Sequence, residues 1–217
     1  MEMSISKENL AKYVTQQLNT IFPDSNPVSR SDIANHIPET LDRIEYCFSH
    51  INDKYYGIGD NTIFNHLNAD HYCSFLYRLA NKVWKETADV NIATKLFLLN
   101  RNFNGVDIYY EVELPDIYLL NHSVGSVIGR AKYSDYLLIN QKCNIGSNHG
   151  KHPSLGHHVS LHPGAMVQGD CNIGNYCKIS TMSCIMDMDL KEYSVYIGTP
   201  KDHIIKESQR VLEIWNN

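Results

Sequence analysis

An aspartate and a histidine lie fifteen residues apart in the segment VDIYYEVELPDIYLLNHSVG, which is rich in β-branched and aromatic side chains. They are Asp107 and His122. A carboxylate that orients an imidazole makes it an effective general base, because the acid fixes the tautomer and stabilises the imidazolium. Residues this far apart can form such a pair only if the fold brings them together. The pair is therefore a hypothesis that depends on the surrounding elements.

A period of six residues dominates the chain from Leu155 onward. Large aliphatic residues recur at every sixth position, at Leu155, Leu161, Val167, Ile173, Ile179 and Ile185. A small or compact residue follows each of the first five after four positions, at Val159, Ala165, Cys171, Cys177 and Ser183. Two inward positions in every six residues predict coils with short flat faces and tight corners, the hexapeptide parallel β-helix.

The same register continues towards the N-terminus. The large positions become Val127, Tyr133, Ile139 and Ile145, and their companions become Ala131, Leu137 and Cys143. The interval from Ile145 to Leu155 is ten residues, so an excursion of four residues is expected around His149-Gly150-Lys151-His152-Pro153. The repeat also explains Cys143, Cys171 and Cys177 as compact corner residues. It predicts architecture and not chemistry, since a parallel β-helix can also be a scaffold without catalytic function.

Apolar residues in the first half of the chain follow helical spacing instead. The predicted helices are Lys7 to Phe22, about Ser31 to Asn52 with Pro38 near its effective start, Ile63 to Glu86, and Ile92 to Phe103. The fold class is therefore α+β. A helical domain is expected over 1–105, a parallel β-helix of hexapeptide repeats over 106–206, and a short tail over 207–217.

Length and composition exclude some classes of protein. The 217 residues fit one large domain or one domain with a smaller attachment, and the net charge of −5 argues against a general nucleic-acid binder. No run approaches the roughly 18 apolar residues of a membrane span, and the N-terminus has no basic segment followed by an apolar core. A cytoplasmic protein is expected, in which the six cysteines, none of them in a CxxC pair, remain reduced.

Three stretches of the predicted β-helix carry a resemblance to a known family. They are Val106-Asp107-Ile108, His122-Ser123-Val124-Gly125-Ser126-Val127-Ile128-Gly129 and Gln141-Lys142-Cys143-Asn144-Ile145-Gly146. In order and spacing they resemble the serine acetyltransferase branch of the hexapeptide-repeat acyltransferases. The likeness extends through Lys151-His152-Pro153 to Ile197-Gly198-Thr199-Pro200. It implies a left-handed parallel β-helix after a helical region, a homotrimer or a dimer of trimers, and acetyl-CoA as co-substrate in the groove between neighbouring coils.

The resemblance also implies roles for individual residues. His122 would take the proton of an acceptor hydroxyl as its oxygen attacks the thioester, and Asp107 would hold the other ring nitrogen. A backbone N–H between Gly146 and Gly150 is the candidate oxyanion donor. Seven positions correspond to cofactor contacts: Gly146, Ser147, Pro163, Lys178, Ser180, Thr181 and Lys201. Lys178 and Lys201 would neutralise phosphates. Pro163 and Ser180 could equally be plain corner residues. No metal is expected.

The acceptor side departs from the family at three places. Asn121 stands where serine acetyltransferases have an acid, and Lys151 stands where they have an arginine. In the family an aspartate of the helical domain completes the site, and Asp60 and Asp70 are the candidates for that aspartate here. Asn121, Lys151 and His152 are the candidate acceptor-binding residues. Because a neutral amide suits a hydroxyl-rich molecule, a sugar of a surface polysaccharide or of its precursor is the predicted acceptor, and L-serine, as in cysteine biosynthesis, is the alternative.

A cluster of histidines raises a different possibility. Five lie within fourteen residues: His149, His152, His157, His158 and His162. Some hexapeptide β-helix trimers resemble carbonic anhydrases, which bind zinc through histidines. The side chains of His157 and His158 are expected to point outward before a corner, so solvated loop histidines are favoured over a zinc enzyme. A non-catalytic scaffold is a third class, and the presence of a spaced histidine and acid argues against it.

Overall fold

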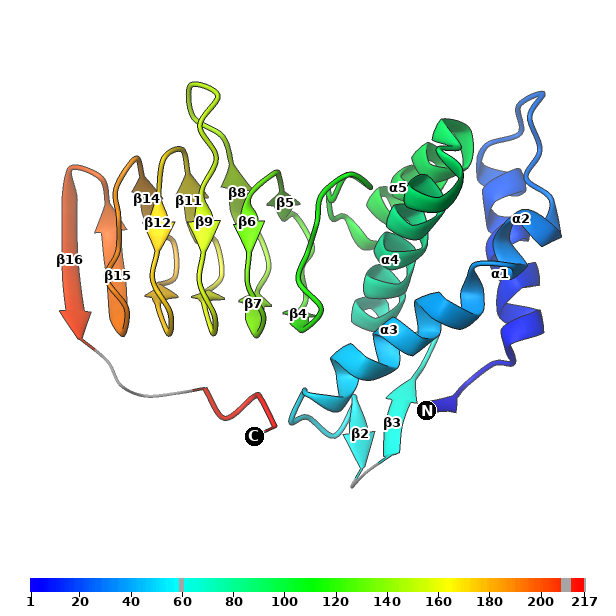
Figure 1. The fold of residues 1–217 in the computed structure, drawn as a ribbon, viewed down its shortest axis with the longest axis horizontal. Coiled ribbons are helices and arrows are strands. Elements are labelled where there is room, and N and C mark those ends of the chain that lie inside the picture. The colour runs from blue at the N-terminus through cyan, green and yellow to red at the C-terminus, as the bar shows by residue number, and fades with distance from the viewer. Residues whose placement is uncertain (59–60, 208–211, 217) are drawn as a thin grey trace. The chain divides into compact units, whose positions relative to one another are not determined.

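The computed structural model describes residues 1–58, 61–207 and 212–216, so Asp60 and part of the predicted tail over 207–217 lie outside the described residues. The chain divides into two compact units. The helical unit comprises Met1–Asn104, Tyr109–Glu111 and Asn216–Asn217, and the β-helix unit comprises Gly105–Ile108 and Val112–Trp215. The helices belong to the first unit and the stacked coils to the second, which confirms the predicted α+β class (Figure 1).

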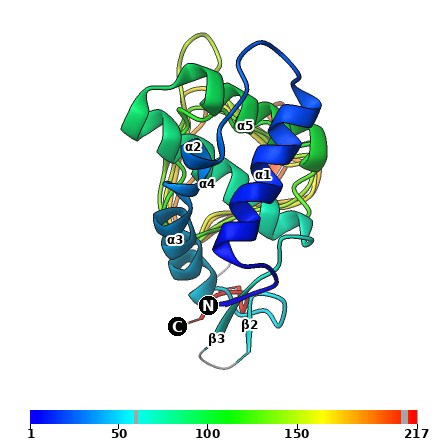
Figure 2. The ribbon, with the colours of Figure 1, turned by 90° about the vertical axis from the view of Figure 1, so that its right-hand side faces the viewer.

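The helical unit contains five helices and a small sheet among its described residues. The helices are α1 (Lys7–Ile21), α2 (Arg30–Ala34), α3 (Ile37–Ser49), α4 (Ala69–Thr87) and α5 (Val90–Asn104). The strands are β1 (Glu2–Met3), β2 (Gly57–Ile58) and β3 (Asn61–Phe64), in the order β1-β3-β2. Figure 2 shows β2 and β3 beside the N-terminus, where β1 pairs with β3. None of the helices in the described part of the chain is both long and apolar enough to cross a bilayer.

Helices α1 and α5 lie close to their predicted ranges, whereas the predicted helix over 31–52 is two helices. Ser29 caps α2 through reciprocal hydrogen bonds with Asp32. Helix α3 begins at Ile37 with Pro38 in its first turn, as the position of the proline predicted. A proline has no backbone N–H and fits only the first turn of a helix, so the chain starts a new helix there.

The predicted helix over 63–86 is wrong at its start. Residues 61–64 form β3, along which buried and more exposed positions alternate as in a strand. Helix α4 begins only after Asn68, whose side-chain oxygen accepts hydrogen bonds from the backbone N–H groups of Asp70 and His71. This N-cap sets the boundary that apolar spacing alone did not reveal.

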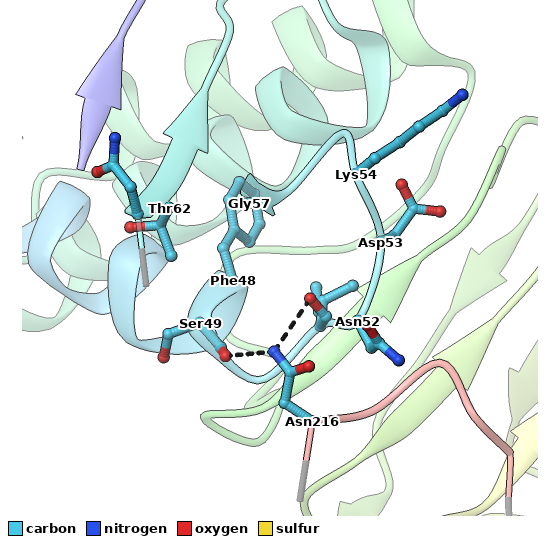
Figure 3. Close-up of a pocket in the computed structure, with 10 residues that line it drawn as sticks. Phe48, Ser49, Asn52, Asp53, Lys54, Gly57, Thr62 and Asn216 are labelled. Carbon is cyan, nitrogen blue, oxygen red and sulfur yellow. Dashed lines mark hydrogen bonds between the residues drawn. The ribbon is translucent and has the colours of Figure 1, made fainter. Parts of the chain in front are cut away.

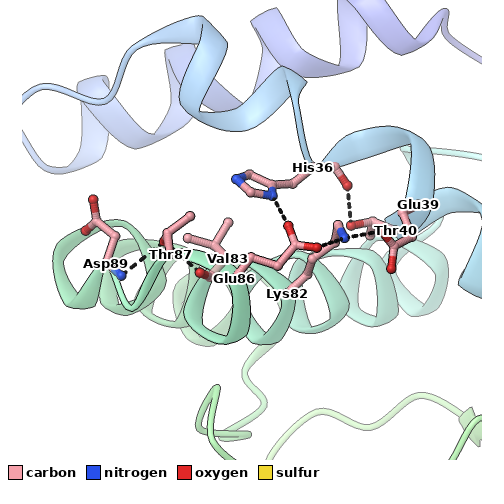
Figure 4. A network of polar contacts seen from close by, with 8 residues as sticks. All are labelled: His36, Glu39, Thr40, Lys82, Val83, Glu86, Thr87 and Asp89. Carbon is pink, nitrogen blue, oxygen red and sulfur yellow. Dashed lines mark hydrogen bonds and ion pairs between the residues drawn. The ribbon is translucent and has the colours of Figure 1, made fainter.

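The buried ammonium of Lys82 in the helical unit has two matched partners. Lys82 is only 6% exposed, and its ammonium contacts the carboxylates of Glu39 and Glu86 (Figure 4). Glu86 also binds the Nδ1 atom of His36 at 2.8 Å. Burial opposes the charge of Lys82, but the hydrogen bonds to the two glutamates outweigh burial and raise the pKa of Lys82. The network ties α3 and the residue before it to α4.

The β-helix unit is built from short strands. They are β4 (Tyr118–Leu120), β5 (Val127–Ile128), β6 (Lys132–Tyr133), β7 (Leu137–Ile139), β8 (Asn144–Gly146), β9 (Ser154–Leu155), β10 (Ser160–Leu161), β11 (Met166–Gln168), β12 (Asn172–Ile173), β13 (Lys178–Ile179), β14 (Cys184–Met186), β15 (Ser194–Thr199) and β16 (Asp202–Glu207). Sheet 1 has the order β16-β15-β13-β10-β7-β4, sheet 2 has β14-β11-β8-β5, and sheet 3 has β12-β9-β6.

The chain visits the three sheets in turn, so β4–β6 form the first coil, β7–β9 the second, β10–β12 the third, and the fourth begins with β13 and β14. Strands of successive coils pair in parallel, and β16 closes sheet 1 as the antiparallel partner of β15. Figure 1 shows these coils stacked from β4 to β15. This architecture confirms the predicted left-handed parallel β-helix.

The series of residues spaced by six fills the interior, as predicted. All six large residues from Leu155 to Ile185 are at most 3% exposed, and so are their five companions. Successive regular coils are offset by eighteen residues, so that Leu161 lies opposite Ile179. The six cysteines form no disulfide, and the three assigned to corners are buried.

The backward continuation of the register is wrong at its N-terminal end. Val127 is 44% exposed, and Ile128, which is 1% exposed, occupies the inward position opposite Ile145. Ala131 is not fully buried either. The interval from Ile128 to Tyr133, the next position in register, is five residues, so a strict count of six misses the inward residue by one.

The predicted four-residue excursion is present. Across it, paired coils are offset by 22 residues, as Ile139 and Leu161 show. Asn148 and Lys151 form an antiparallel bridge with N–H···O distances of 3.1 and 2.9 Å. Gly150 lies at the tip with a φ of 75°, a conformation that glycine adopts without strain. The excursion is therefore a small hairpin that leaves the coil.

Candidate functional site

One corner of the β-helix is two residues longer in the first coil than in the next three. This first corner joins sheet 1 to sheet 2. In the first coil it spans residues 121–126, between β4 and β5. In the following coils it spans only four residues, at 140–143, 162–165 and 180–183. Because the strands on both sides stay in register, the two additional residues must leave the regular path of the coil.

His122 lies in this enlarged corner. Its side chain is exposed, and its backbone is in the left-handed region with a φ of 50°. Such a φ occurs in non-glycine residues mainly at single positions in turns. Two short hydrogen bonds close this turn, from the N–H of Val124 to the carbonyl of His122 at 2.8 Å and from the N–H of Ser126 to the carbonyl of Ser123 at 3.0 Å. The enlarged corner therefore holds the imidazole on the outside of the coil.

Asp107 pairs in parallel with β5, the strand that follows the same corner. Its N–H donates to the carbonyl of Ser126 at 2.9 Å, and its carbonyl accepts from the N–H of Ile128 at 2.8 Å. Asp107 is half-buried, whereas His122 is exposed. The fold brings both positions to the first coil, and a contact between their side chains stays a prediction.

Most of the predicted cofactor residues lie along the first corner of the later coils. Pro163 belongs to this corner in the third coil, and Ser180 and Thr181 belong to it in the fourth. Lys178 is on β13 directly before the corner. Lys201 is in the turn after β15, which runs parallel to β13 and ends at the same edge. These five residues and the enlarged corner thus share one edge of the β-helix.

His162 also lies at this edge, although sequence reasoning assigned it only to the histidine cluster. It directly precedes Pro163 in the corner of the third coil. Burial, and then the positive charge of Lys178, lower the pKa of His162, so its ring is neutral at pH 7. A neutral imidazole can both donate and accept a hydrogen bond beside the predicted cofactor residues.

Asn121 begins the enlarged corner, and the remaining predicted residues lie at the other end of sheet 2. Gly146 ends β8, and Ser147, Lys151 and His152 belong to the excursion. The strands of sheet 2 run from the first corner to the excursion, a path of roughly 15 Å at about 3.3 Å per residue. One chain therefore does not bring this group to the corner that carries His122.

Two acceptor-binding candidates have neighbours within the β-helix unit. The ammonium of Lys151 binds the carboxylate of Asp170 at 3.0 Å, with side chains that are 65% and 61% exposed. Water screens such a pair, so an incoming carboxylate can compete for Lys151. The Nδ1 atom of His152 lies 3.1 Å from the carbonyl oxygen of Arg130. Since a carbonyl only accepts, Nδ1 carries the proton, and Nε2 is the acceptor nitrogen of the neutral ring.

A polar groove of about 560 Å³ borders the excursion. It is lined by Asn148, His149, Lys151, Asp170, Asn172, Asp187 and Asp189. Asp187 fixes the excursion to the next corner of the coil, because its carboxylate accepts from the N–H of Asp170 at 2.9 Å and from the side chain of Asn148 at 2.6 Å. The same hydrogen bonds lower the pKa of Asp187. The sequence analysis did not single out Asp170 or Asp187. Their separation of seventeen residues, about one coil, was the signal that could have placed them side by side.

A second groove, of about 720 Å³, lies in the helical unit (Figure 3). It is lined by Phe48, Ser49, Ile51, Asn52, Asp53, Lys54, Gly57, Asn61, Thr62 and Asn216. The side chain of Asn216 donates to the carbonyl of Ser49 at 2.8 Å. None of the residues predicted for the site lies here.

The histidine cluster is not a solvated group throughout. His158 stacks between Tyr136 and Tyr176, with ring centroids 4.2 and 4.6 Å apart, and Tyr176 stacks on Tyr193 at 4.9 Å. Burial, and then the nearby His157, lower the pKa of His158. The solvated placement expected for His158 is therefore wrong, because its half-buried ring completes an aromatic ladder along the corner between sheets 3 and 1. In the described part of the chain no group of three or more His, Cys, Asp or Glu side chains is arranged to hold a metal ion.

The fold and the enlarged corner define the class of the protein as a left-handed parallel β-helix of the hexapeptide-repeat type with a helical N-terminal region. Known proteins similar to it are serine acetyltransferases. The serine acetyltransferase of Synechococcus elongatus is 31% identical over 140 residues, which cover 62% of this chain and 57% of the relative. That of Staphylococcus xylosus is 28% identical over 137 residues, which cover 61% of this chain and 62% of the relative. The match thus spans about three fifths of these relatives, and no family model matches the chain.

Solved structures of serine acetyltransferases have the same fold. The enzyme from Brucella abortus superimposes with a TM-score of 0.72 at 16% identity, over 95% of this chain and 85% of that structure. A serine acetyltransferase in complex with CoA gives a TM-score of 0.69 at 18% identity, over 93% and 85% of the two chains. The resemblance inferred from the sequence motifs is thereby confirmed for the fold of both the helical region and the β-helix.

Proposed function

We propose that this protein is an acetyl-CoA-dependent O-acetyltransferase that acetylates the hydroxyl group of L-serine. The observation that carries the proposal is His122, exposed in an enlarged corner beside the segment of Asp107, in a chain similar to serine acetyltransferases. The names of these relatives favour L-serine, the alternative considered above, over a sugar hydroxyl.

In this proposal His122 is the general base. Its imidazole takes the proton of the hydroxyl as the oxygen attacks the carbonyl carbon of the thioester, and it returns the proton to the departing thiolate. Asp107 holds the other ring nitrogen and stabilises the imidazolium between these two steps. Each turnover thus forms one ester bond, breaks one thioester bond and leaves the histidine unchanged.

The edge that carries His122 is the proposed cofactor groove. Pro163, Ser180 and Thr181 follow one another there at coil corners, where small side chains leave backbone groups accessible to an extended ligand. Lys178 and Lys201 supply local positive charge for phosphates on a chain whose net charge is −5. One of the structural neighbours was solved as a complex with CoA, which supports acetyl-CoA as the co-substrate.

The separation of the two site regions supports a homo-oligomer. Lys151, His152, Ser147 and Gly146 lie at the far end of sheet 2 from His122, so they can join its site only from another copy of the chain. We propose a trimer or a dimer of trimers, because side faces of a triangular coil stack suit a threefold axis. A cytoplasmic location completes the proposal, since the six cysteines are unpaired thiols and acetyl-CoA is an intracellular metabolite.

A thiol-release assay tests the activity and the acceptor together. Purified protein is incubated with acetyl-CoA and with L-serine, free sugars, sugar nucleotides or oligosaccharides. Rapid release of CoA with L-serine alone is the expected result. Release with a sugar and not with L-serine would overturn the proposed acceptor, and release with none of them would overturn the activity. Sedimentation analysis gives the assembly, expected at three or six times the 24.8 kDa of one chain.

A further inference from the structure

Asn121 and Asn140 form a hydrogen-bonded amide pair directly before the candidate base. The Nδ2 atom of Asn121 donates to Oδ1 of Asn140 at 2.9 Å, and Nδ2 of Asn140 donates to the carbonyl of Leu161 at 2.8 Å. Asn140 is only 8% exposed, whereas Asn121 is half-buried. The two residues occupy the same position of the first corner in successive coils. The pair is therefore built into the stacking of the coils.

The partners of this pair fix the direction of both amides. A backbone carbonyl only accepts hydrogen bonds, so Asn140 must turn its Nδ2 towards Leu161. Its Oδ1 then faces Asn121, which must offer Nδ2 in return. Rotation of either amide by half a turn would place two acceptors or two donors opposite each other, at the cost of a buried unsatisfied group. The Oδ1 atom of Asn121 consequently points out of the pair, and no described residue donates to it.

Asn140 is also attached to the corner that carries the base. The hydroxyl of Ser126, the last residue of the enlarged corner, donates to the backbone carbonyl of Asn140 at 3.0 Å. The same hydroxyl accepts from the N–H of Cys143 at 3.0 Å. Ser126 and Cys143 are each 1% exposed. Movement of Asn140 would therefore disturb buried hydrogen bonds on both sides, which keeps the amide pair in place.

We infer that Asn140 is a positioning residue that holds Asn121 as a neutral hydrogen-bond acceptor for a donor group of the acceptor molecule. The inference rests on the proposed function, in which this group is the ammonium of L-serine. An amide that could rotate would offer either a donor or an acceptor to the substrate. The fixed amide offers an acceptor only, and it does so without the charge of an acid and without a proton to lose near neutral pH. Asn140 thus contributes to acceptor selection although it lies behind the surface.

Steady-state kinetics of Asn140→Ser test this role. Serine already occupies the same position of the first corner at Ser180, so the coil accommodates it, but its short side chain cannot reach both Leu161 and Asn121. The KM for L-serine is expected to rise roughly threefold to tenfold, the factor that one hydrogen bond provides. The KM for acetyl-CoA and kcat should stay near the wild-type values. The KM for 3-hydroxypropanoate, which lacks the ammonium group, should not change.

Asn140→Asp guards against a mere loss of folding. It has the shape of asparagine and keeps an oxygen towards Asn121, but it loses the donor to the carbonyl of Leu161. It should therefore lower the free energy of unfolding, while the KM for L-serine rises less than in Asn140→Ser. Asn144→Ser is the matched control, because it removes another amide contact, from Gln168 to Asn144 at 3.1 Å on sheet 2, and should leave the KM unchanged.

A double-mutant cycle separates positioning from a general structural effect. If Asn140 acts through Asn121, then Asn140→Ser has no further effect on the KM for L-serine in an Asn121→Ala background. Fully additive effects, or an equal rise in KM for L-serine and for 3-hydroxypropanoate, would overturn the inference. A wild-type protein that does not turn over L-serine would overturn the proposed function and with it the identity of the bound group.

Discussion

The helical unit and the β-helix unit are held together in different ways. In the helical unit a buried charge depends on particular partners far away in the sequence, as when Lys95 binds Asp24 at 2.7 Å and the carbonyl of Asn26 at 2.6 Å. In the β-helix unit the environment of a residue follows from its place in a repeat. Departures from the repeat are local there, at the corner of residues 121–126 and at the excursion. A departure from regular structure can therefore point to a functional site in the β-helix unit, where a repeat defines what is regular, but not in the helical unit, which has no repeat.

The largest effect is expected where the β-helix departs from its repeat. His122→Ala should lower kcat by about 10²–10⁴-fold, since it removes the proposed proton transfer. The free energy of unfolding should remain unchanged, because the side chain is exposed. A thiol-release assay with acetyl-CoA and L-serine measures kcat. His157→Ala makes the same substitution at an exposed position of a regular coil and should leave kcat unchanged. If both variants lost kcat equally, the enlarged corner would have no special role in catalysis.

The next effect tests the regular part of the β-helix. Ile179 is fully buried in the inward series, so Ile179→Ala should lower the free energy of unfolding by about 2–5 kcal/mol through lost burial and a residual cavity. Val127→Ala is the control, because a strict six-residue repeat predicts that Val127 is buried, whereas it is 44% exposed. This substitution should change the free energy of unfolding by less than about 0.5 kcal/mol. Urea denaturation measures both. A large loss for Val127→Ala would contradict the corrected register.

A pH dependence is expected from the helical unit. His71 is fully buried, and burial lowers its pKa to about 4. Below about pH 6.5 the unfolded chain binds a proton at this residue that the folded chain does not, so stability falls as the pH drops from 6.5 towards 4. The total loss is about 3 kcal/mol at 1.36 kcal/mol per pKa unit.

Urea unfolding of the wild type and of His71→Leu at pH 7 and pH 4.5 isolates this contribution. The variant cannot titrate at this position, so it should lose less stability than the wild type between the two values of pH. Equal losses would mean that His71 is protonated in the folded state. The Nδ1 atom of His71 accepts a hydrogen bond from the N–H of Asn65 at 3.1 Å, so the comparison must use differences between pH values, not absolute stabilities.

The smallest effect concerns the excursion. Lys151→Arg should lower the KM for L-serine by roughly twofold to fivefold, because a planar guanidinium can bind the carboxylate through two hydrogen bonds. Stability should change by less than about 1 kcal/mol, since the pair of Lys151 with Asp170 is exposed. Steady-state kinetics with varied L-serine measure the KM. An unchanged KM would argue that this residue does not contact the acceptor.

Much of the β-helix could be predicted, and less of the helical unit. The inward series from Leu155 to Ile185 was readable because a coil demands the same two interior positions every six residues. The start of α4 was not, since the apolar residues of β3 and α4 fit one helical series, in which only the cap at Asn68 marks the change. The aromatic ladder was also missed, although His158 and Tyr176 lie one coil apart, because contacts between coil corners do not appear as a local pattern.

The candidate site divides in the same way. The sequence indicated His122 and Asp107 as a possible base and acid, and it indicated the excursion that separates Lys151 from them along the coil. It did not show that the corner at 121–126 is enlarged, because the two additional residues are visible only when β4 and β5 are paired with the next coil.

The sequence by itself determined the repeat, and through the repeat the stacked coils and their interior. Only the tertiary structure decided which side chains meet between coils. Asn121 faces Asn140 at a separation of nineteen residues, not the eighteen of a regular coil, because the enlarged corner adds two residues and the five-residue interval from Ile128 to Tyr133 removes one. A hydrogen bond needs positions correct to within a fraction of an ångström, and a periodic pattern of hydrophobic residues sets only which face of the coil each residue takes.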